Sequence, residues 1–216
     1  MNTLWHRCGG DSLMVLLPGA YMAASEIAGN GIFETVDRHR LALDLCVPDL
    51  GLDAVSSGEA LPAVQQSILE PARADYRQVW LGGISLGGLL SLCQKAHHPA
   101  TVDGLCLIAP YPGSRLTTGA IERAGGIDAW EPNAEQRADP EFRAWQWLKS
   151  PPADCPVFIG YGIEDRFAEG MSAMAARFPE SDRRIVPGGH DWSAWRQLWE
   201  DFIGLFLRTG HFSKRP

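Results

Sequence analysis

Short apolar runs, separated by turn residues and by helix-like patterns, recur along this 216-residue chain. An apolar run of four to eight residues that ends at Gly or Pro is typical of a buried strand. On this basis we predict six strands, at residues 12–17, 40–47, 78–81, 104–109, 156–161 and 184–186. The predicted strand at 40–47 is the least regular of the first five, because it contains the charged Asp44.

Between these runs the apolar residues follow a helical period. We predict helices at residues 59–74, 86–97, 167–178 and 192–207, the last with aromatic side chains on a recurring face. Buried strands that alternate with helices indicate an α/β protein, with a parallel sheet covered on both faces. The length suits a single domain over residues 1–216. Residues 113–154 are the least regular stretch, and we expect either covering helices or a small lid there.

The junction of the third strand and its helix carries the most informative motif. Gly83-Ile84-Ser85-Leu86-Gly87 fits G-x-S-x-G, in which a sharp turn presents a serine hydroxyl above the sheet edge. The glycines leave room for the neighbouring strand and helix. The N–H of Leu86, at the helix start, points to where an oxyanion would form. The motif predicts a serine nucleophile, although a Gly-rich turn that only packs closely is the alternative.

A serine nucleophile needs a base and a group that orients the base. Of the six histidines, His190 is the best candidate, because it follows the last predicted strand on a glycine loop. Glu164 and Asp165 both follow the fifth strand, and catalytic groups of open α/β sheets collect at the carboxyl ends of strands. From position alone, either carboxylate could orient the imidazole.

Together, Gly83-Ile84-Ser85-Leu86-Gly87, Gly162-Ile163-Glu164-Asp165 and Gly188-Gly189-His190-Asp191-Trp192 resemble the α/β-hydrolase superfamily, serine esterase type. The resemblance implies a minimal α/β-hydrolase fold of about six mostly parallel strands. It also implies the catalytic residues Ser85, Asp165 and His190. The second oxyanion donor would be the N–H of Ala20, with Tyr21 as the alternative, paired with that of Leu86. Tyr21 and Trp192 would line the substrate pocket.

The resemblance implies hydrolysis of a small carboxylic ester through an acyl-enzyme, with no metal or organic cofactor. Alternatives are a thioesterase or acyltransferase with the same triad, or a non-catalytic binding module on this fold.

Composition and charge limit the kinds of partner that this chain is expected to bind. The net charge is −7 and no basic run occurs, so a nucleic-acid partner is not expected. We expect a small-molecule ester or thioester substrate. No stretch is apolar enough for a signal sequence or a membrane span, and the five cysteines are scattered, so we expect a cytoplasmic protein. The oligomeric state is not predicted.

Overall fold

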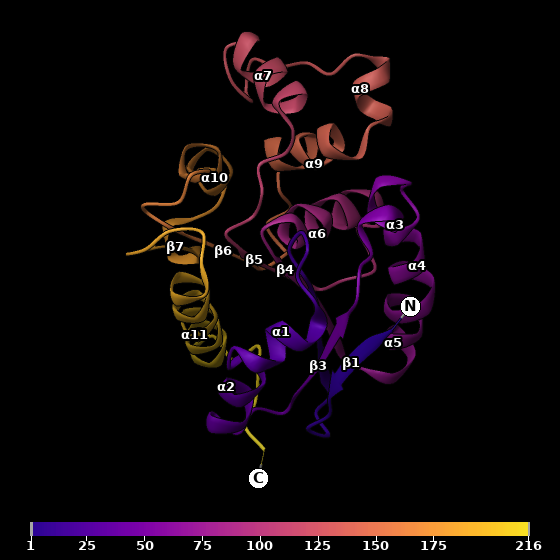
Figure 1. The fold of residues 1–216 in the computed structure, drawn as a ribbon, viewed down its shortest axis with the longest axis vertical. Coiled ribbons are helices and arrows are strands. Elements are labelled where there is room, and N and C mark those ends of the chain that lie inside the picture. Colours follow the sequence, from indigo (N-terminus) through magenta and orange to yellow (C-terminus); the bar gives the residue numbers. More distant parts are fainter. Residues whose placement is uncertain (1, 216) are drawn as a thin grey trace.

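The computed structural model describes residues 2–215, which form a seven-stranded sheet in the order β1-β3-β2-β4-β5-β6-β7 (Figure 1). All neighbouring strands are parallel except β1, which pairs with β3 antiparallel. The strands are β1 (Thr3–His6), β2 (Ser12–Leu17), β3 (Leu43–Pro48), β4 (Gln78–Ile84), β5 (Gly104–Ile108), β6 (Val157–Gly162) and β7 (Arg183–Val186). The predicted α/β class and the mostly parallel sheet are therefore confirmed.

The predicted number of strands was too low by one. The seventh strand, β1, has only four residues, all half-buried, and lies at the edge of the sheet. Its backbone pairs with β3 from Thr3 opposite Pro48 to His6 opposite Leu45. A strand this short has no apolar run of its own, so only the pairing with β3 defines it.

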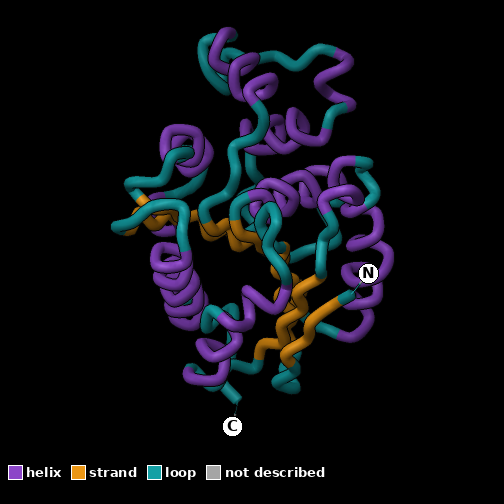
Figure 2. The backbone as a smooth tube through the Cα atoms, viewed as in Figure 1, coloured by secondary structure: helices purple, strands orange, loops and turns teal. Residues whose placement is uncertain are grey.

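Helices cover both faces of the sheet, as the tube in Figure 2 shows. On one side lie α1 (Ala24–Gly29), α2 (Ile32–Arg38) and α11 (Trp192–Arg208) (Figure 1). On the other lie α3 (Leu52–Ser56), α4 (Ala60–Val64), a π-helical turn η1 (Gln65–Leu69), α5 (Glu70–Asp75) and α6 (Leu86–His97). Helix α10 (Ala168–Ala175) contacts β6, and a short 3₁₀ turn η2 (Glu180–Asp182) precedes β7.

The aromatic face predicted at 192–207 is buried against the centre of the sheet. Trp80 on β4 is fully buried, and its ring lies 4.6 Å from that of Phe206 and 5.8 Å from that of Phe202. Edge-to-face contacts of this kind stabilise beyond the area they bury, by about 0.5–1.5 kcal/mol each. The contacts hold α11, and the loop that precedes it, at a defined position on the sheet.

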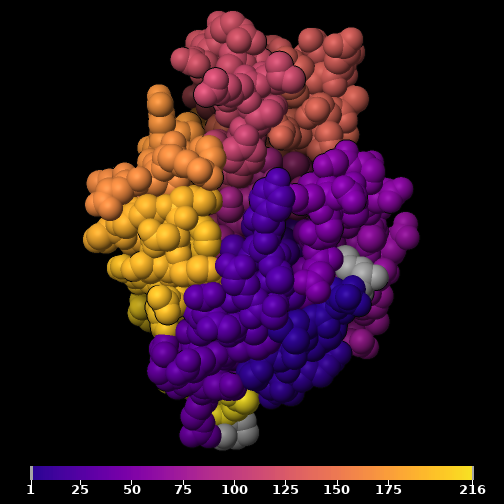
Figure 3. All heavy atoms as spheres, viewed as in Figure 1, coloured from indigo at the N-terminus to yellow at the C-terminus, as the bar shows by residue number. Residues whose placement is uncertain are grey.

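Residues 113–154 form three helices: α7 (Arg115–Arg123), α8 (Ala134–Ala138) and α9 (Pro140–Lys149). They protrude beyond the rest of the molecule at the top of Figure 3. Two of the aromatic contacts show how the segment is held together and attached to the rest of the chain. Trp130 stacks on Phe142 at 5.7 Å, and the Trp145 indole N–H donates to the Pro112 carbonyl at 2.9 Å.

No helix within residues 2–215 is long and apolar enough to cross a membrane.

Gly87, at the start of α6, lies against the end of β2. A Cβ at this position would come 2.0 Å from the Leu17 carbonyl oxygen, a backbone atom that cannot move aside alone. We therefore expect Gly87→Ala to lower the free energy of unfolding by about 2–4 kcal/mol. Urea unfolding followed by circular dichroism measures this change.

Gly29 in α1 is the matched control, because a Cβ there has nothing within 4 Å. Gly29→Ala should leave stability unchanged or raise it by up to about 1 kcal/mol. Equal stability of the two variants would contradict a close approach between α6 and β2.

Candidate active site

Ser85 lies in the turn between β4 and α6, with φ 55° and ψ −116°. A non-glycine residue costs about 1–3 kcal/mol in such a region, so the surroundings must hold it there. The Ser85 N–H donates to the Ile108 carbonyl at 3.0 Å, and its carbonyl accepts from Gly88 at 3.0 Å and Tyr111 at 2.9 Å. These bonds tie the strained serine to β5 and to the first turn of α6.

His190 reaches Ser85 from the loop between β7 and α11. Its Nε2 lies 2.8 Å from the Ser85 hydroxyl oxygen, and its Nδ1 lies 2.5 Å from the Asp165 Oδ2. With the proton on Nδ1, the imidazole donates to the carboxylate and accepts the serine O–H at Nε2. This is the geometry in which a histidine can take a proton from a serine.

The structure distinguishes between the two carboxylates after β6. The Asp165 side chain is completely buried, and its Oδ1 accepts the Phe167 N–H at 2.9 Å while its Oδ2 faces His190. Glu164 is exposed, and its backbone N–H donates to the Gly188 carbonyl at 3.0 Å. The carboxylate in contact with the imidazole is therefore that of Asp165.

Aromatic side chains that the sequence did not mark as functional hold the imidazole. The Phe167 and Trp195 rings meet the His190 ring edge-on, at 5.4 and 5.2 Å between centroids. Trp195 could be recognised only as part of the buried face of α11, and nothing in its spacing indicated a contact with His190. The two rings restrict the imidazole to the plane in which it bridges Ser85 and Asp165.

The loop that contains His190 is fixed at both ends. Asp191 caps α11 by accepting the Ser193 and Ala194 N–H groups at 2.8 and 3.3 Å. At the end of β6, a Cβ on Gly162 would lie 2.2 Å from the Gly188 carbonyl oxygen. The loops after β6 and β7 therefore approach so closely that only glycine fits at position 162. This approach brings Asp165 and His190 together.

The loop after β2 lies beside Ser85, as an oxyanion donor must. A Cβ on Gly19 would lie 3.5 Å from the Ser85 Cβ and 3.3 Å from the Ile84 carbonyl oxygen. Among the described residues, no backbone hydrogen bond outside the regular elements uses the N–H of Ala20, Tyr21 or Leu86. These amides are free to donate to an oxyanion, and both Ala20 and Tyr21 remain candidates for the second donor.

Three exposed apolar side chains lie on segments that follow the carboxyl ends of central strands. Within residues 2–215, the large hydrophobic side chains that stand exposed are Tyr21, Leu116, Ile163 and Ile185. The first three follow β2, β5 and β6, whereas Ile185 is on the edge strand β7. Tyr21 has a φ of 61° and is 90% exposed, so its ring does not form part of a closed pocket wall.

Trp192, the other predicted pocket residue, is half-buried. Its indole N–H donates to the Glu26 carboxylate at 2.9 Å, and its ring lies 5.2 Å from that of Trp195. Trp192 thus joins the start of α11 to α1, and the Trp195 ring lies between it and His190.

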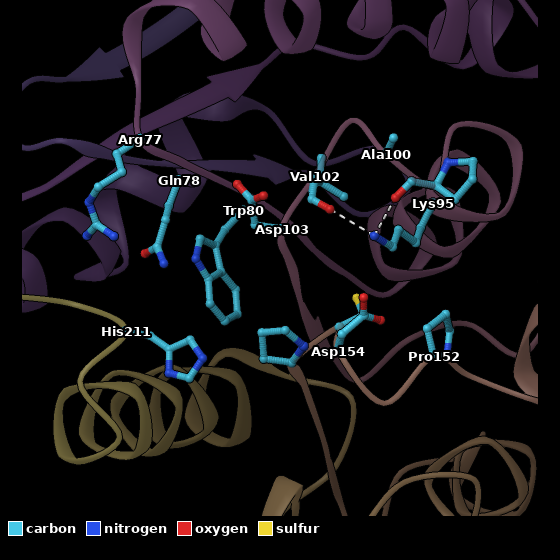
Figure 4. Close-up of a pocket in the computed structure, with 13 residues that line it drawn as sticks. Arg77, Gln78, Trp80, Lys95, Ala100, Val102, Asp103, Pro152, Asp154 and His211 are labelled. Carbon is cyan, nitrogen blue, oxygen red and sulfur yellow. Dashed lines mark hydrogen bonds between the residues drawn. The ribbon is translucent and has the colours of Figure 1, made fainter.

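A separate cavity of about 770 Å³ lies at the opposite edge of the sheet, where β4, β5 and β6 begin (Figure 4). Trp80, Gln78 and His211 line one part of it, and Lys95 and Asp154 another. Lys95 is buried there, and its ammonium group donates to the Pro99 and Val102 carbonyls, as the dashed lines show. None of Ser85, Asp165 and His190 lines this cavity, so it is not part of the candidate active site.

Several solved structures share this arrangement of strands and helices. A Staphylococcus aureus S-formylglutathione hydrolase superposes with a TM-score of 0.65 at 13% identity, over 90% of this chain and 83% of that one. The chain has the α/β-hydrolase fold. Mouse alpha/beta hydrolase domain-containing protein 10 gives a TM-score of 0.63 at 17% identity, over 96% and 94% of the two chains. A thermophilic esterase from Thermogutta terrifontis gives 0.61 at 16%, over 97% and 94%.

No protein-family model matches the sequence, and no curated protein matches it. In this chain the elbow after β4 and the loops after β6 and β7 follow the carboxyl ends of parallel strands, and these segments carry Ser85, Asp165 and His190.

The contact between Gly19 and the elbow gives a test of the oxyanion loop. Gly19→Val would add methyl groups beside the Ser85 Cβ, where a substrate carbonyl has to approach. We expect turnover of p-nitrophenyl acetate to fall by about 10²-fold or more, since one oxyanion donor is worth that much. A normally folded Gly19→Val protein with unchanged turnover would disprove the oxyanion role.

The exposed apolar side chains give a second test. Tyr21→Ser should raise KM for octanoyl esters by about three- to tenfold, because a longer acyl chain loses apolar contact, and should leave acetyl esters unchanged. Ile185→Ser is the matched control, with a comparable loss of exposed apolar surface on β7. An equal effect of both variants on octanoyl esters would show that Tyr21 makes no specific contact with the acyl chain.

Proposed function

We propose that this protein is a serine hydrolase that cleaves a small carboxylic ester through an acyl-enzyme intermediate. The observation that carries the proposal is the continuous chain of contacts from the buried Asp165 through His190 to the hydroxyl of Ser85. A lone serine in a tight turn needs no such partners. The strained conformation of Ser85 adds support, because strain of this kind collects at functional sites.

The geometry supports the following sequence of steps. His190 Nε2 takes the hydroxyl proton as Ser85 Oγ attacks the ester carbonyl, and Asp165 stabilises the resulting imidazolium. The negative charge on the tetrahedral oxygen is held by the N–H of Leu86 and of Ala20 or Tyr21. His190 then protonates the leaving alcohol. Water, activated by the same imidazole, attacks the acyl group and releases Ser85.

Thioester hydrolysis, or acyl transfer to an acceptor other than water, is the second candidate. It uses the same triad, and one similar structure is an S-formylglutathione hydrolase, whose named substrate is a thioester. Rates on matched p-nitrophenyl esters and acyl-CoA thioesters distinguish ester from thioester preference. A binding module without activity would turn over neither and would not react with a fluorophosphonate at Ser85.

The buried position of Asp165 predicts unequal effects for the two neighbouring carboxylates. Asp165→Asn preserves size but favours the wrong imidazole tautomer, which costs about 10⁴-fold in turnover in serine proteases. Glu164→Gln changes an exposed side chain and should cost about tenfold or less. The measurement is turnover of p-nitrophenyl acetate, with circular dichroism as the folding control.

Ser85→Ala and His190→Ala should each lose at least as much turnover as Asp165→Asn. Combining these substitutions should add almost nothing, because the three residues act as a unit. The assignment of the acid would be refuted if Glu164→Gln lost most of its turnover while Asp165→Asn kept nearly all of it. Additive losses would argue against a triad.

A further inference from the structure

A second group of chemically active side chains lies at the far end of the molecule from the candidate active site. His6 ends β1, Cys8 is in the following turn, and Asp37 is in the last turn of α2. Their ligand atoms, one from each residue, all lie within 4.8 Å of one another. Within residues 2–215 no other three His, Cys, Asp or Glu side chains converge in this way.

We propose that His6, Cys8 and Asp37 form a zinc-binding site that joins the N-terminal strand to α2. The His6 Nε2 lies 3.1 Å from the Asp37 Oδ1, and the Cys8 Sγ lies 4.0 Å from the same oxygen. Around a tetrahedral zinc ion with ordinary bond lengths, such ligand atoms are about 3.3–3.6 Å apart. Small rotations of the side chains bring the three atoms to these distances, with the fourth position left to water.

The donor set selects the metal. Thiolate and imidazole are ligands of zinc and of softer transition metals, whereas calcium and magnesium take oxygen ligands. A set of one cysteine, one histidine and one aspartate therefore fits Zn²⁺. This site is independent of the proposed hydrolase reaction, in which no metal takes part.

The backbone places His6 and Cys8 side by side. The strand ends at His6, and Cys8 follows two residues later in the turn. The course of this turn depends on two glycines: Gly9 has a φ of 70°, and a Cβ on Gly10 would lie 2.0 Å from the Ala42 carbonyl oxygen. Asp44 holds the same turn, since its Oδ1 accepts the Cys8 N–H at 2.7 Å.

The third ligand is held near the other two by packing and hydrogen bonding. The His6 ring stacks on Phe33 of α2, with 5.0 Å between centroids, and Asp37 lies one helical turn further along. The Asp37 side chain is half exposed, so a metal ion can approach from solvent. Little reorganisation is therefore needed before a metal binds.

One arginine contacts the Asp37 ligand, and another lies near Asp44, which bonds to Cys8. Arg215 donates to the Asp37 Oδ1 at 2.9 Å, and Arg7 lies 3.9 Å from the Asp44 carboxylate. Arg215 is a competitor for the carboxylate. Its backbone N–H is bonded to the Arg40 carbonyl, so its side chain can move away without releasing the C-terminal segment. The turn after β1, helix α2 and the segment that ends at Arg215 lie at this end of the molecule (Figure 1).

The test is titration of the full-length, EDTA-treated protein with Co²⁺, followed by displacement with Zn²⁺. We expect one cobalt per chain, with a near-ultraviolet thiolate-to-cobalt charge-transfer band that zinc abolishes. Cys8→Ser should lose the band, and Asp37→Asn should weaken cobalt binding by about tenfold or more. Arg215→Gln should bind at least as tightly as the unchanged protein, because a competing cation is gone.

Cys155→Ser is the matched control, since Cys155 is the other half-buried thiol and lies outside the cluster. It should keep the full charge-transfer band. Zinc at about 100 times its Kd should raise Tm by about 5 °C or more in the unchanged protein and not in Cys8→Ser. Ser85→Ala should bind cobalt normally, so failure of the hydrolase proposal and failure of the zinc proposal are distinguishable.

Three results would overturn the zinc site: no charge-transfer band, a band that survives in Cys8→Ser, or a band that Cys155→Ser removes. Binding only at millimolar metal, without a shift in Tm, would mark an adventitious cation and would also overturn it.

Discussion

The close approach of backbone to backbone around the elbow is the constraint on which the candidate active site depends. A Cβ on Gly83 would lie 2.1 Å from the Gly87 backbone, and one on Gly87 would lie 2.0 Å from the end of β2. Only glycine allows β4, α6 and β2 to meet at these distances. The same contacts bring the loop after β2 beside Ser85 and hold the serine in its strained conformation.

A similar close approach of backbone to backbone occurs between β6 and β7. The carboxyl ends of β6 and β7 meet at Gly162 and Gly188, and each loop carries one side chain of the Asp165–His190 pair. Burial of Asp165 and the aromatic rings around the imidazole then fix the orientation of His190. Precise placement therefore comes from packed strand ends and aromatic contacts.

The two edges of the sheet carry different chemistry. At the carboxyl edge, the loops after parallel strands converge on Ser85. Loops of open α/β sheets generally meet at this edge, because parallel strands all end there. At the amino edge, β1 turns back antiparallel and brings His6 and Cys8 to α2. That convergence depends on a four-residue edge strand with no apolar signal in the sequence.

Local spacing and turn residues encode the alternation of strands and helices and the elbow at Ser85. They also mark His190, Glu164 and Asp165 as candidates. That Asp165, and not Glu164, contacts His190 is visible only in the folded chain, since adjacent loop residues differ in burial and not in pattern. The seventh strand also depends on the fold, because it exists through pairing with β3. The three helices of residues 113–154 and the contact of Trp195 with His190 also required the fold, because they depend on residues far apart in the chain.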